Sequence, residues 1–241
     1  YYEQSLRLFD RLPAALRGQD ETVRLHAMAL RRMGALSWVK MRLAPAEAYY
    51  RKALALQDDA LARDPANAAK RLELHTTLGD LGGVLNQGGR VDEAITLWTR
   101  GLAIAEEARA ADPVNLGAAD AVALIRARIG EAAREAGRHD EAVTHLRAVV
   151  ALRDASARRL GSAPDAIGER AYARLYLARA LLDAADGGAG AARASLVAEA
   201  RTLMRATPRT DVVKPIRSVP VAYFHEQYDA VLARLGGRKG S

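Results

Sequence analysis

Residues 78–101 read LGDLGGVLNQGGRVDEAITLWTRG, and the spacing of small and large side chains in this stretch decides the fold. Gly82, Ala94 and Trp98 belong to sets of positions that recur every 48 residues along the chain. The recurring sets are Gly34, Gly82 and Gly130; Ala46, Ala94 and Ala142; and Tyr50, Trp98 and Leu146. A fixed period between about 20 and 50 residues is typical of repeat proteins, in which each unit buries its apolar face against the next.

Each period contains two amphipathic helical segments. Apolar residues between Pro65 and Gly88 recur at spacings of three and four, which is the helical signature. The Asp-Pro pair at 64–65, and again at 112–113, is expected to start a helix, with the aspartate as its cap and the proline in its first turn. Gly88-Gly89 is expected to end that helix, because glycine accepts the left-handed conformation found at helix ends. The period therefore predicts two helices of about 20 residues per unit.

The same period divides the whole chain. Residues 1–17 are predicted to be the second helix of a truncated repeat, so the chain is expected to start in mid-repeat, as a piece of a longer protein. The segments that follow are repeat 1 (18–65), repeat 2 (66–113), repeat 3 (114–161), a divergent repeat 4 (162–206), an extended connector (207–220), a capping helix (221–236) and a disordered tail (237–241). Residues 1–236 are expected to form one continuous domain, because a repeat array grows by adding neighbours.

Composition favours helices and narrows the range of partners. Half of the 241 residues are apolar, with only two Phe and two Trp, so we expect an all-α protein that packs through small side chains. The formal net charge is +7, but acids are interleaved with the arginines in every repeat, which argues against nucleic-acid binding. The sequence has no run of 18 apolar residues and no signal peptide, so it is predicted to be cytoplasmic and not inserted in a membrane.

The sequence shows no pattern of catalytic chemistry. Cysteine is absent, which excludes disulfides, thiolate catalysis and Cys-based metal sites. The five histidines share no repeat register and make no metal-ligand pattern. No phosphate-binding loop after a strand, nucleophile elbow or kinase motif is present. We therefore predict no enzymatic activity, no catalytic or metal-binding residue and no cofactor.

The central stretch resembles the tetratricopeptide repeat. The residues that carry the resemblance are Leu78, Leu81-Gly82, Leu85, Gly89, Ala94, Trp98 and Gly101, closed by Pro113. The usual tetratricopeptide unit has about 34 residues, so the unit found here is longer by about four helical turns. The resemblance implies a right-handed superhelical solenoid of antiparallel helix pairs, ended by a C-terminal capping helix.

In the tetratricopeptide family the first helix of each unit lines a concave groove that binds a partner. The resemblance places the following residues in that groove: Arg32, Trp38, Thr76, Asp80, Asn86, Gln87, Arg128 and Arg134. The family's Lys and Asn clamp on a peptide carboxylate is not reproduced, since Gly79 and Ala127 stand where its basic residues are expected. The arginines suit an acidic segment, because a guanidinium pairs well with carboxylates. Trp38 is expected either to anchor a partner or to pack between units.

The long repeat also resembles arrays attached to bacterial serine/threonine protein kinases. The Asp-Pro-x-Asn strings at 64–67 and 112–115 carry this second resemblance. It implies a non-enzymatic scaffold that binds a protein or peptide, as the sensory or recruiting part of a signalling protein. The alternative is a self-association module that forms homo-oligomers through its ends or through its C-terminal helix, which either caps the array or binds in trans.

Overall fold

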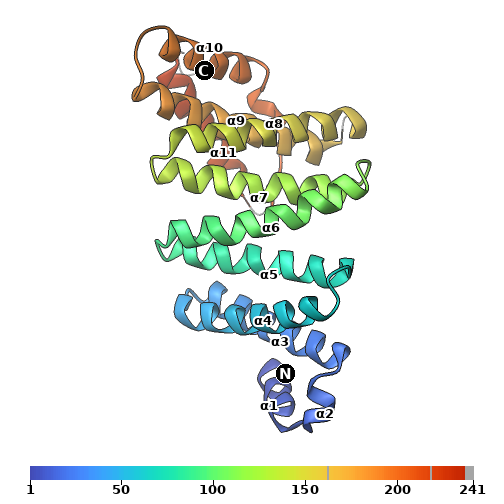
Figure 1. Cartoon of the computed structure of the whole chain (residues 1–241). Coiled ribbons are helices and arrows are strands. Elements are labelled where there is room, and N and C mark those ends of the chain that lie inside the picture. Colours follow the sequence, from blue (N-terminus) through green and yellow to red (C-terminus); the bar gives the residue numbers. More distant parts are fainter. Residues whose placement is uncertain (162, 218, 237–241) are drawn as a thin grey trace. The chain divides into compact units, whose positions relative to one another are not determined.

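The computed structural model describes residues 1–161, 163–217 and 219–236, and this part of the chain is all-α (Figure 1). Its helices are α1 (Tyr2–Arg11), α2 (Ala14–Arg17), α3 (Asp20–Val39), α4 (Leu43–Arg63), α5 (Ala68–Gln87), α6 (Val91–Ala111), α7 (Leu116–Glu135), α8 (His139–Leu160), α9 (Pro164–Asp186), α10 (Gly190–Arg205) and α11 (Val221–Arg234). In these ranges no helix combines the length and the apolarity that a membrane span requires. The disordered tail predicted for residues 237–241 lies outside the described residues.

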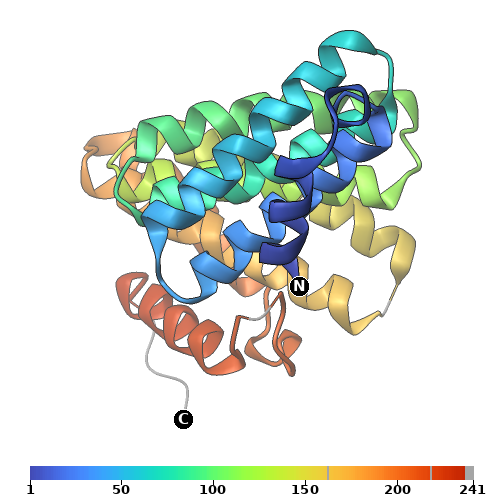
Figure 2. The same cartoon turned by 90° about the horizontal axis from the view of Figure 1, so that it is seen from below.

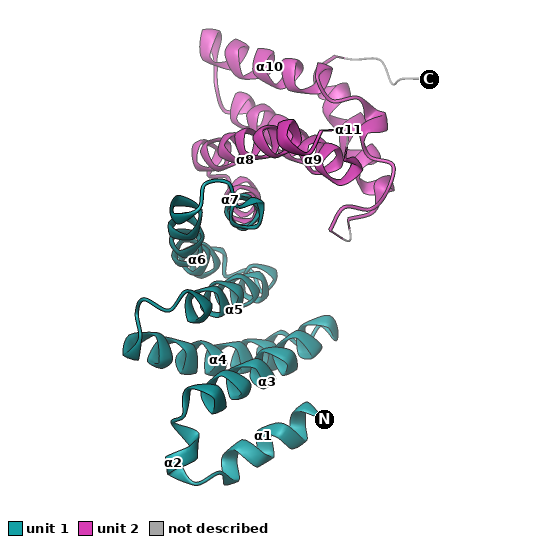
Figure 3. Ribbon diagram, turned by 90° about the vertical axis from the view of Figure 1, so that its right-hand side faces the viewer, with its two compact units in different colours: residues 1–125 teal, residues 126–241 magenta. Residues whose placement is uncertain are grey.

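The chain divides into two compact units, residues 1–125 and 126–241 (Figure 3). The boundary falls inside α7, whose residues 116–125 belong to unit 1 and whose remaining residues belong to unit 2. Within each unit, helices pack against their neighbours in the chain: α3 on α4, α4 on α5 and α5 on α6 in unit 1, and α8 on α9 and α9 on α10 in unit 2. Each unit is thus a helical array in itself, while one continuous domain over residues 1–236 stays a prediction.

The first helix of a repeat unit, α5 in repeat 2 and α7 in repeat 3, starts later than the Asp-Pro pairs predict. The N-cap of α5 is Asn67, whose side-chain oxygen accepts a hydrogen bond from the Lys70 N–H at 3.1 Å. Asn115 makes the same bond to the N–H of Ala118, also at 3.1 Å. The predicted cap by the aspartate of the pair is therefore wrong. The proline lies in the connecting turn, and the asparagine three residues after each aspartate satisfies the free N–H instead.

The segment predicted as one helix over residues 1–17 is broken in two. Helix α1 ends at Arg11, and α2 is a single turn that begins at Ala14. Leu12 between them is extended, with φ −64° and ψ 142°, because a residue before proline avoids the α-helical region. Leu61 of α4 occupies the position of Pro13 one repeat later. Because Leu61 is not a proline, α4 continues without a break to Arg63.

The turn that joins the two helices of a unit uses one left-handed residue at a fixed register position. This residue is Met41 (φ 57°), Gly89 (φ 78°) or Gly137 (φ 76°). The N–H of the following arginine donates to a carbonyl five residues earlier: Arg42 to Ser37 at 2.9 Å, Arg90 to Leu85 at 2.9 Å, and Arg138 to Ala133 at 2.8 Å. This is the hydrogen bond of the Schellman motif, and it holds Met41 in a conformation that favours glycine.

Met41→Gly is expected to stabilise unit 1 by about 0.5–1 kcal/mol. A non-glycine residue in the left-handed region costs about 1–2 kcal/mol, and the conformational entropy of glycine offsets part of that gain. Met41 is 64% exposed, so the substitution loses little packing beyond the contact of its sulfur with the Gln87 amide at 3.4 Å. Urea denaturation measures the change, and Gly89→Met is expected to shift the midpoint in the opposite direction. Unchanged midpoints for both variants would contradict the strain at Met41.

Glycines of the first helices lie directly beneath large side chains of the second helices. A Cβ atom at Gly82 would lie 2.7 Å from Cδ1 and Cε2 of the Trp98 indole. Trp98 is buried, and its Nε1–H donates to the Gly79 carbonyl at 3.1 Å, so the buried polar atom is satisfied. The equivalent pairs are Gly34 with Tyr50 and Gly130 with Leu146. The recurring glycines of the sequence are therefore the points of closest approach between paired helices.

Helix α11 packs on α9 within unit 2. Phe224 is fully buried, and its ring centroid lies 4.9 Å from that of Tyr172. The Tyr172 hydroxyl donates to the carbonyl of Pro220 at 3.2 Å, where α11 starts. At the other end Arg234 pairs with Asp183 at 2.7 Å and with Asp186 at 2.8 Å. Helix α11 therefore covers α9 in cis.

The connector before α11 is not extended throughout. Residues Arg209–Asp211 form a 3-10 turn, and the N–H of Val219 donates to the carbonyl of Ile216 at 2.8 Å. Val212 and Ile216 are buried, so the segment contributes apolar side chains to unit 2. The three prolines exclude a long helix here, but they leave short turns possible.

Candidate interaction surface

The first helices of unit 1, α3 and α5, contact each other through pairs of residues, three of which share one register. Arg24 lies 3.9 Å from Glu73, and Arg31 lies 3.4 Å from Asp80. Trp38 donates its indole N–H to the side-chain oxygen of Gln87 at 2.5 Å. Successive pairs are seven residues apart on both helices, so α3 and α5 run parallel with their side chains in a constant register.

Unit 2 has a corresponding pair between α7 and α9. Arg134 and Asp183, which stand 96 residues after Trp38 and Gln87, form an ion pair at 3.0 Å. Burial opposes ionisation of Asp183, but hydrogen bonds from Arg234 and Arg134 outweigh it and lower its pKa. Burial raises the pKa of the nearby Glu131, although Arg134 lies 3.2 Å and Arg179 3.4 Å away. The contact between first helices is therefore a partly buried ionic network in this unit.

Four of the eight predicted groove residues contact a neighbouring first helix. These are Trp38, Asp80, Gln87 and Arg134. The Trp38 ring also lies against α5 at Gly83, where an added Cβ would approach Cη2 to 2.5 Å, so it packs between helices. The hydroxyl of Thr76 donates to the carbonyl of Leu72 in its own helix at 2.9 Å.

The other predicted groove residues differ in exposure. Asn86 and Arg128 are half-buried, whereas Arg32 is exposed and has no ion pair with any described residue. The groove assignment of the eight residues stays a prediction. Among them, Arg32 has a charged group that is open to a partner.

An exposed apolar stripe surrounds Arg32 on α3. Leu25, Met28, Leu36 and Val39 are 36%, 40%, 48% and 84% exposed. With Arg32, these residues follow one another at spacings of three and four along one side of the helix, and we call them the α3 stripe. Figure 2 looks onto this end of unit 1, with α1 and α2 nearest the viewer and α1 in front of α3, which it contacts. The stripe is not evident from apolar spacing alone, although the repeat register contains a signal: residues 25, 32 and 39 stand 48 positions before Glu73, Asp80 and Gln87.

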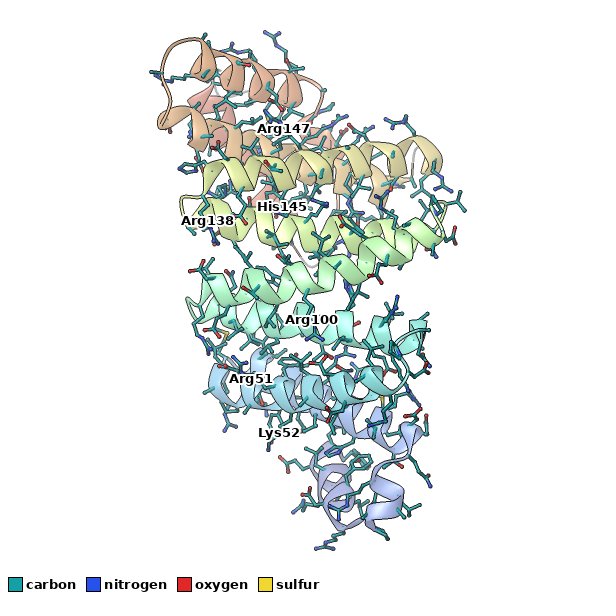
Figure 4. The ribbon with its side chains drawn as sticks, in the orientation of Figure 1. Arg51, Lys52, Arg100, Arg138, His145 and Arg147 are labelled. Atoms are coloured by element: carbon teal, nitrogen blue, oxygen red, sulfur yellow. The ribbon has the colours of Figure 1, made fainter. Side chains whose placement is uncertain are left out.

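Cationic side chains of the second helices are labelled in Figure 4, and most of them are paired with acids. In unit 1, Arg51 lies 2.8 Å from Glu47, and Arg100 pairs with Asp58. In unit 2, Arg147 lies 2.6 Å from Glu199. Paired cations at exposed sites contribute little to stability and attract phosphates only weakly, so these helices do not form a free basic patch in either unit.

A cavity of about 210 Å³ lies between α3, α4 and α5. Val23, Ala27 and Ala60 form apolar parts of its wall, and ion pairs such as Lys70 with Asp20 at 2.8 Å lie at its edge. Gln57 of α4 is only 6% exposed and faces this cavity, and its side-chain oxygen has no hydrogen-bond partner in the described part of the chain. Metal ligands do not gather in threes here or elsewhere among the described residues.

Gln57→Leu is expected to stabilise unit 1 by about 1–2 kcal/mol, because a buried polar atom without a partner loses its hydration and gains nothing in return. Ala105 occupies the same register position one repeat later, which shows that the array accepts an apolar residue there. Thermal and urea unfolding measure the change, with Gln57→Asn as the control that keeps the amide. A loss of stability in the leucine variant would mean that the amide is satisfied in solution.

Comparisons with known proteins leave the family open. No family model matches the chain, and no curated protein matches it. Among solved structures, the crystal structure of BtubC (BKLC) from P. vanneervenii aligns with 98% of this chain and 84% of its own, at 16% identity and a TM-score of 0.49. A computationally designed self-assembling cyclic homo-oligomer aligns with 98% of this chain and 88% of its own, at 11% identity and a TM-score of 0.24. Neither likeness extends to function.

Proposed function

We propose that this chain is a non-enzymatic interaction scaffold that receives a helical segment of a partner protein on the α3 stripe. In this proposal the helix pairs form a right-handed superhelical solenoid of the tetratricopeptide type. The observation that carries it is the exposure of four large apolar side chains at helical spacing along one helix. Single exposed apolar residues are common on protein surfaces, but a continuous stripe marks an interaction site.

The repeat itself supports a helix as the bound element. The face of α5 that corresponds to the α3 stripe is covered by another helix, α3, through Arg31 and Trp38. The α3 stripe is partly exposed among the described residues beside the contact of α1 with α3, and its apolar residues have the spacing that receives the apolar side of an amphipathic helix. A helix that docks there completes for α3 the contact that α5 already has.

The resemblance to kinase-attached arrays supports a wider proposal. In it, the scaffold is the recruiting part of a larger bacterial signalling protein such as a serine/threonine kinase, and its ligand is a protein or peptide. The α3 stripe supplies the recruiting surface, and any catalytic step belongs to another domain.

A display library of 20-residue helical peptides, selected on the full chain, tests the proposal. Selected peptides are expected to lose about tenfold or more in affinity for Val39→Asp, because a carboxylate placed in an apolar contact must lose its hydration. Val114→Asp is the matched control, since Val114 is a valine exposed to 68% in the turn before α7, outside the stripe. Peptides that bind both variants equally well use another surface, and this result would contradict the proposal.

Self-association through the same open face is the second candidate function. A two-fold, antiparallel pairing of α3 with α3 of a second copy brings the central Arg32 residues of the two copies together, and like charges at a contact oppose it. Light scattering over a dilution series tests this candidate. A monomer at every concentration eliminates it.

A further inference from the structure

The cavity of about 210 Å³ between α3, α4 and α5 has an apolar inner wall and a charged mouth. Val23, Ala27 and Ala60 form the inner wall and are 8%, 1% and 7% exposed. Asp20 and Arg24 also line the cavity but are exposed, so this end opens to solvent. The volume exceeds the roughly 150 Å³ of an apolar cavity that holds benzene, so a substituted ring has room here.

Gln57 of α4 brings a carboxamide to the wall of this cavity. The residue is only 6% exposed, and its Oε1 atom has no hydrogen-bond partner among the residues that the structure describes. A buried acceptor in that state has lost its hydration without a replacement. The packing of the helices does not require the amide, because the equivalent residue of α6 is Ala105, which is also buried. The oxygen is therefore positioned to accept a hydrogen bond from a molecule that enters the cavity.

The polar groups at the mouth are paired with one another. Lys70 lies 2.8 Å from Asp20, and Arg24 lies 2.6 Å from Glu21. A charged ligand would compete with these ion pairs and would lose its hydration at the apolar inner wall, whereas a neutral ligand avoids both costs. A water molecule beside Gln57 would also be poorly held, because a buried water needs about two to four polar partners. The wall therefore suits a neutral organic molecule with an apolar body and a hydrogen-bond donor.

The cavity depends on side chains that are particular to repeat 1. In α5 the position of Ala27 carries His75, whose Nδ1 atom lies 2.9 Å from the carbonyl oxygen of Gly101 in α6. The position of Val23 carries Arg71, which donates to an acid of α6 at 2.8 Å. These larger side chains reach from a first helix to the second helix of its unit. The small residues of α3 leave that space to the cavity.

We infer that this cavity binds a small neutral alcohol or phenol. The apolar body of the ligand packs on Val23, Ala27 and Ala60, and its hydroxyl donates a hydrogen bond to Oε1 of Gln57. The hydroxyl also matches the chemistry of the site because it carries no charge at neutral pH, unlike an amine or a carboxylic acid. The inference goes beyond the proposed function, since the residues that line the cavity are not those of the α3 stripe.

The probes p-cresol and toluene test the inference, because they have nearly the same shape and differ by one hydroxyl. Titration of the full chain, followed by ligand-detected NMR, is expected to show about fivefold tighter binding of p-cresol, which alone satisfies the buried oxygen. In heteronuclear spectra the side-chain amide signals of Gln57 are expected to shift with p-cresol. Gln57→Met keeps an unbranched side chain of similar length and removes the acceptor. This variant is expected to prefer toluene, because the cresol hydroxyl is then buried without a partner.

Gln227→Met, in α11 of unit 2, makes the same chemical change outside the cavity and is expected to leave both affinities unchanged. Ala27→Leu is expected to fill the cavity and abolish binding of both probes, with circular dichroism as the check that the chain stays helical. Equal affinities of the wild type for the two probes, or no binding of p-cresol, would overturn the inference. A preference for p-cresol that persists in Gln57→Met would also overturn it, since the hydroxyl is then bound elsewhere.

Discussion

Gly82→Val is expected to destabilise unit 1 by about 3 kcal/mol, among the largest effects of any single substitution in this unit. A Cβ atom at this position would lie 2.7 Å from two atoms of the Trp98 ring, closer than non-bonded carbons approach. Trp98 is only 2% exposed and its N–H is held by the Gly79 carbonyl, so the ring cannot move aside without losing a hydrogen bond. Urea denaturation of the full chain, followed by circular dichroism and by tryptophan fluorescence, measures the loss.

Two other glycines, Gly34 within α3 and Gly18 in the turn after α2, control for the general effect of replacing glycine. Gly34→Ala is expected to cost about 1 kcal/mol, because the new Cβ lies 3.0 Å from the Tyr50 ring and a small shift relieves the contact. Gly18→Ala has nothing within 4 Å and is expected to stabilise the chain by about 0.5 kcal/mol. If the midpoint of Gly82→Val matches that of Gly34→Ala, the indole is not the close neighbour that the fold requires.

The sequence was informative about this packing because the decisive contacts are local to one repeat. Gly82 and Trp98 are 16 residues apart, and the same pair of sizes recurs as Gly34 with Tyr50. A 48-residue period that keeps small residues opposite large ones leaves little choice other than paired helices. Helix type and length were therefore predictable, and α5 and α6, with 20 and 21 residues, have the expected size.

Helix boundaries were less predictable, because a boundary depends on which nearby side chain reaches the free N–H groups. Both Asp64 and Asn67 are good cap residues, and the sequence does not say which one the helix uses. The break after Arg11 depends on Pro13, which keeps the preceding residue out of the helical region. The choice of one cap residue over another changes the free energy of unfolding by about 1 kcal/mol, and the repeat pattern does not reveal so small a difference.

The candidate interaction surface was the least predictable part, because exposure depends on what lies next to a helix and not on the helix itself. The sequence allows Trp38 to anchor a partner, but in the structure its indole packs against Gly83 of α5. Leu25 and Val39 read as ordinary first-helix residues, since buried and exposed apolar positions alternate along α3. The exposure of these two residues follows from the contacts between parallel first helices, whose residues are 49 positions apart. Those contacts are known only once the helices are packed.

Phe224→Ala is expected to destabilise unit 2 by about 3–5 kcal/mol, because it removes a fully buried ring and leaves a cavity between α11 and α9. The ring also has an edge-to-face contact with Tyr172 at 4.9 Å, which adds to the loss. Hydrogen exchange is expected to show faster exchange in α9 as well as in α11, since α11 covers α9. Tyr223→Ala, at a neighbouring position that is 37% exposed, is the control and is expected to cost less than about 1 kcal/mol. If Phe224→Ala leaves α9 protected while α11 alone exchanges, α11 is a detachable helix and not a cap, and its apolar face is then open to a partner in trans.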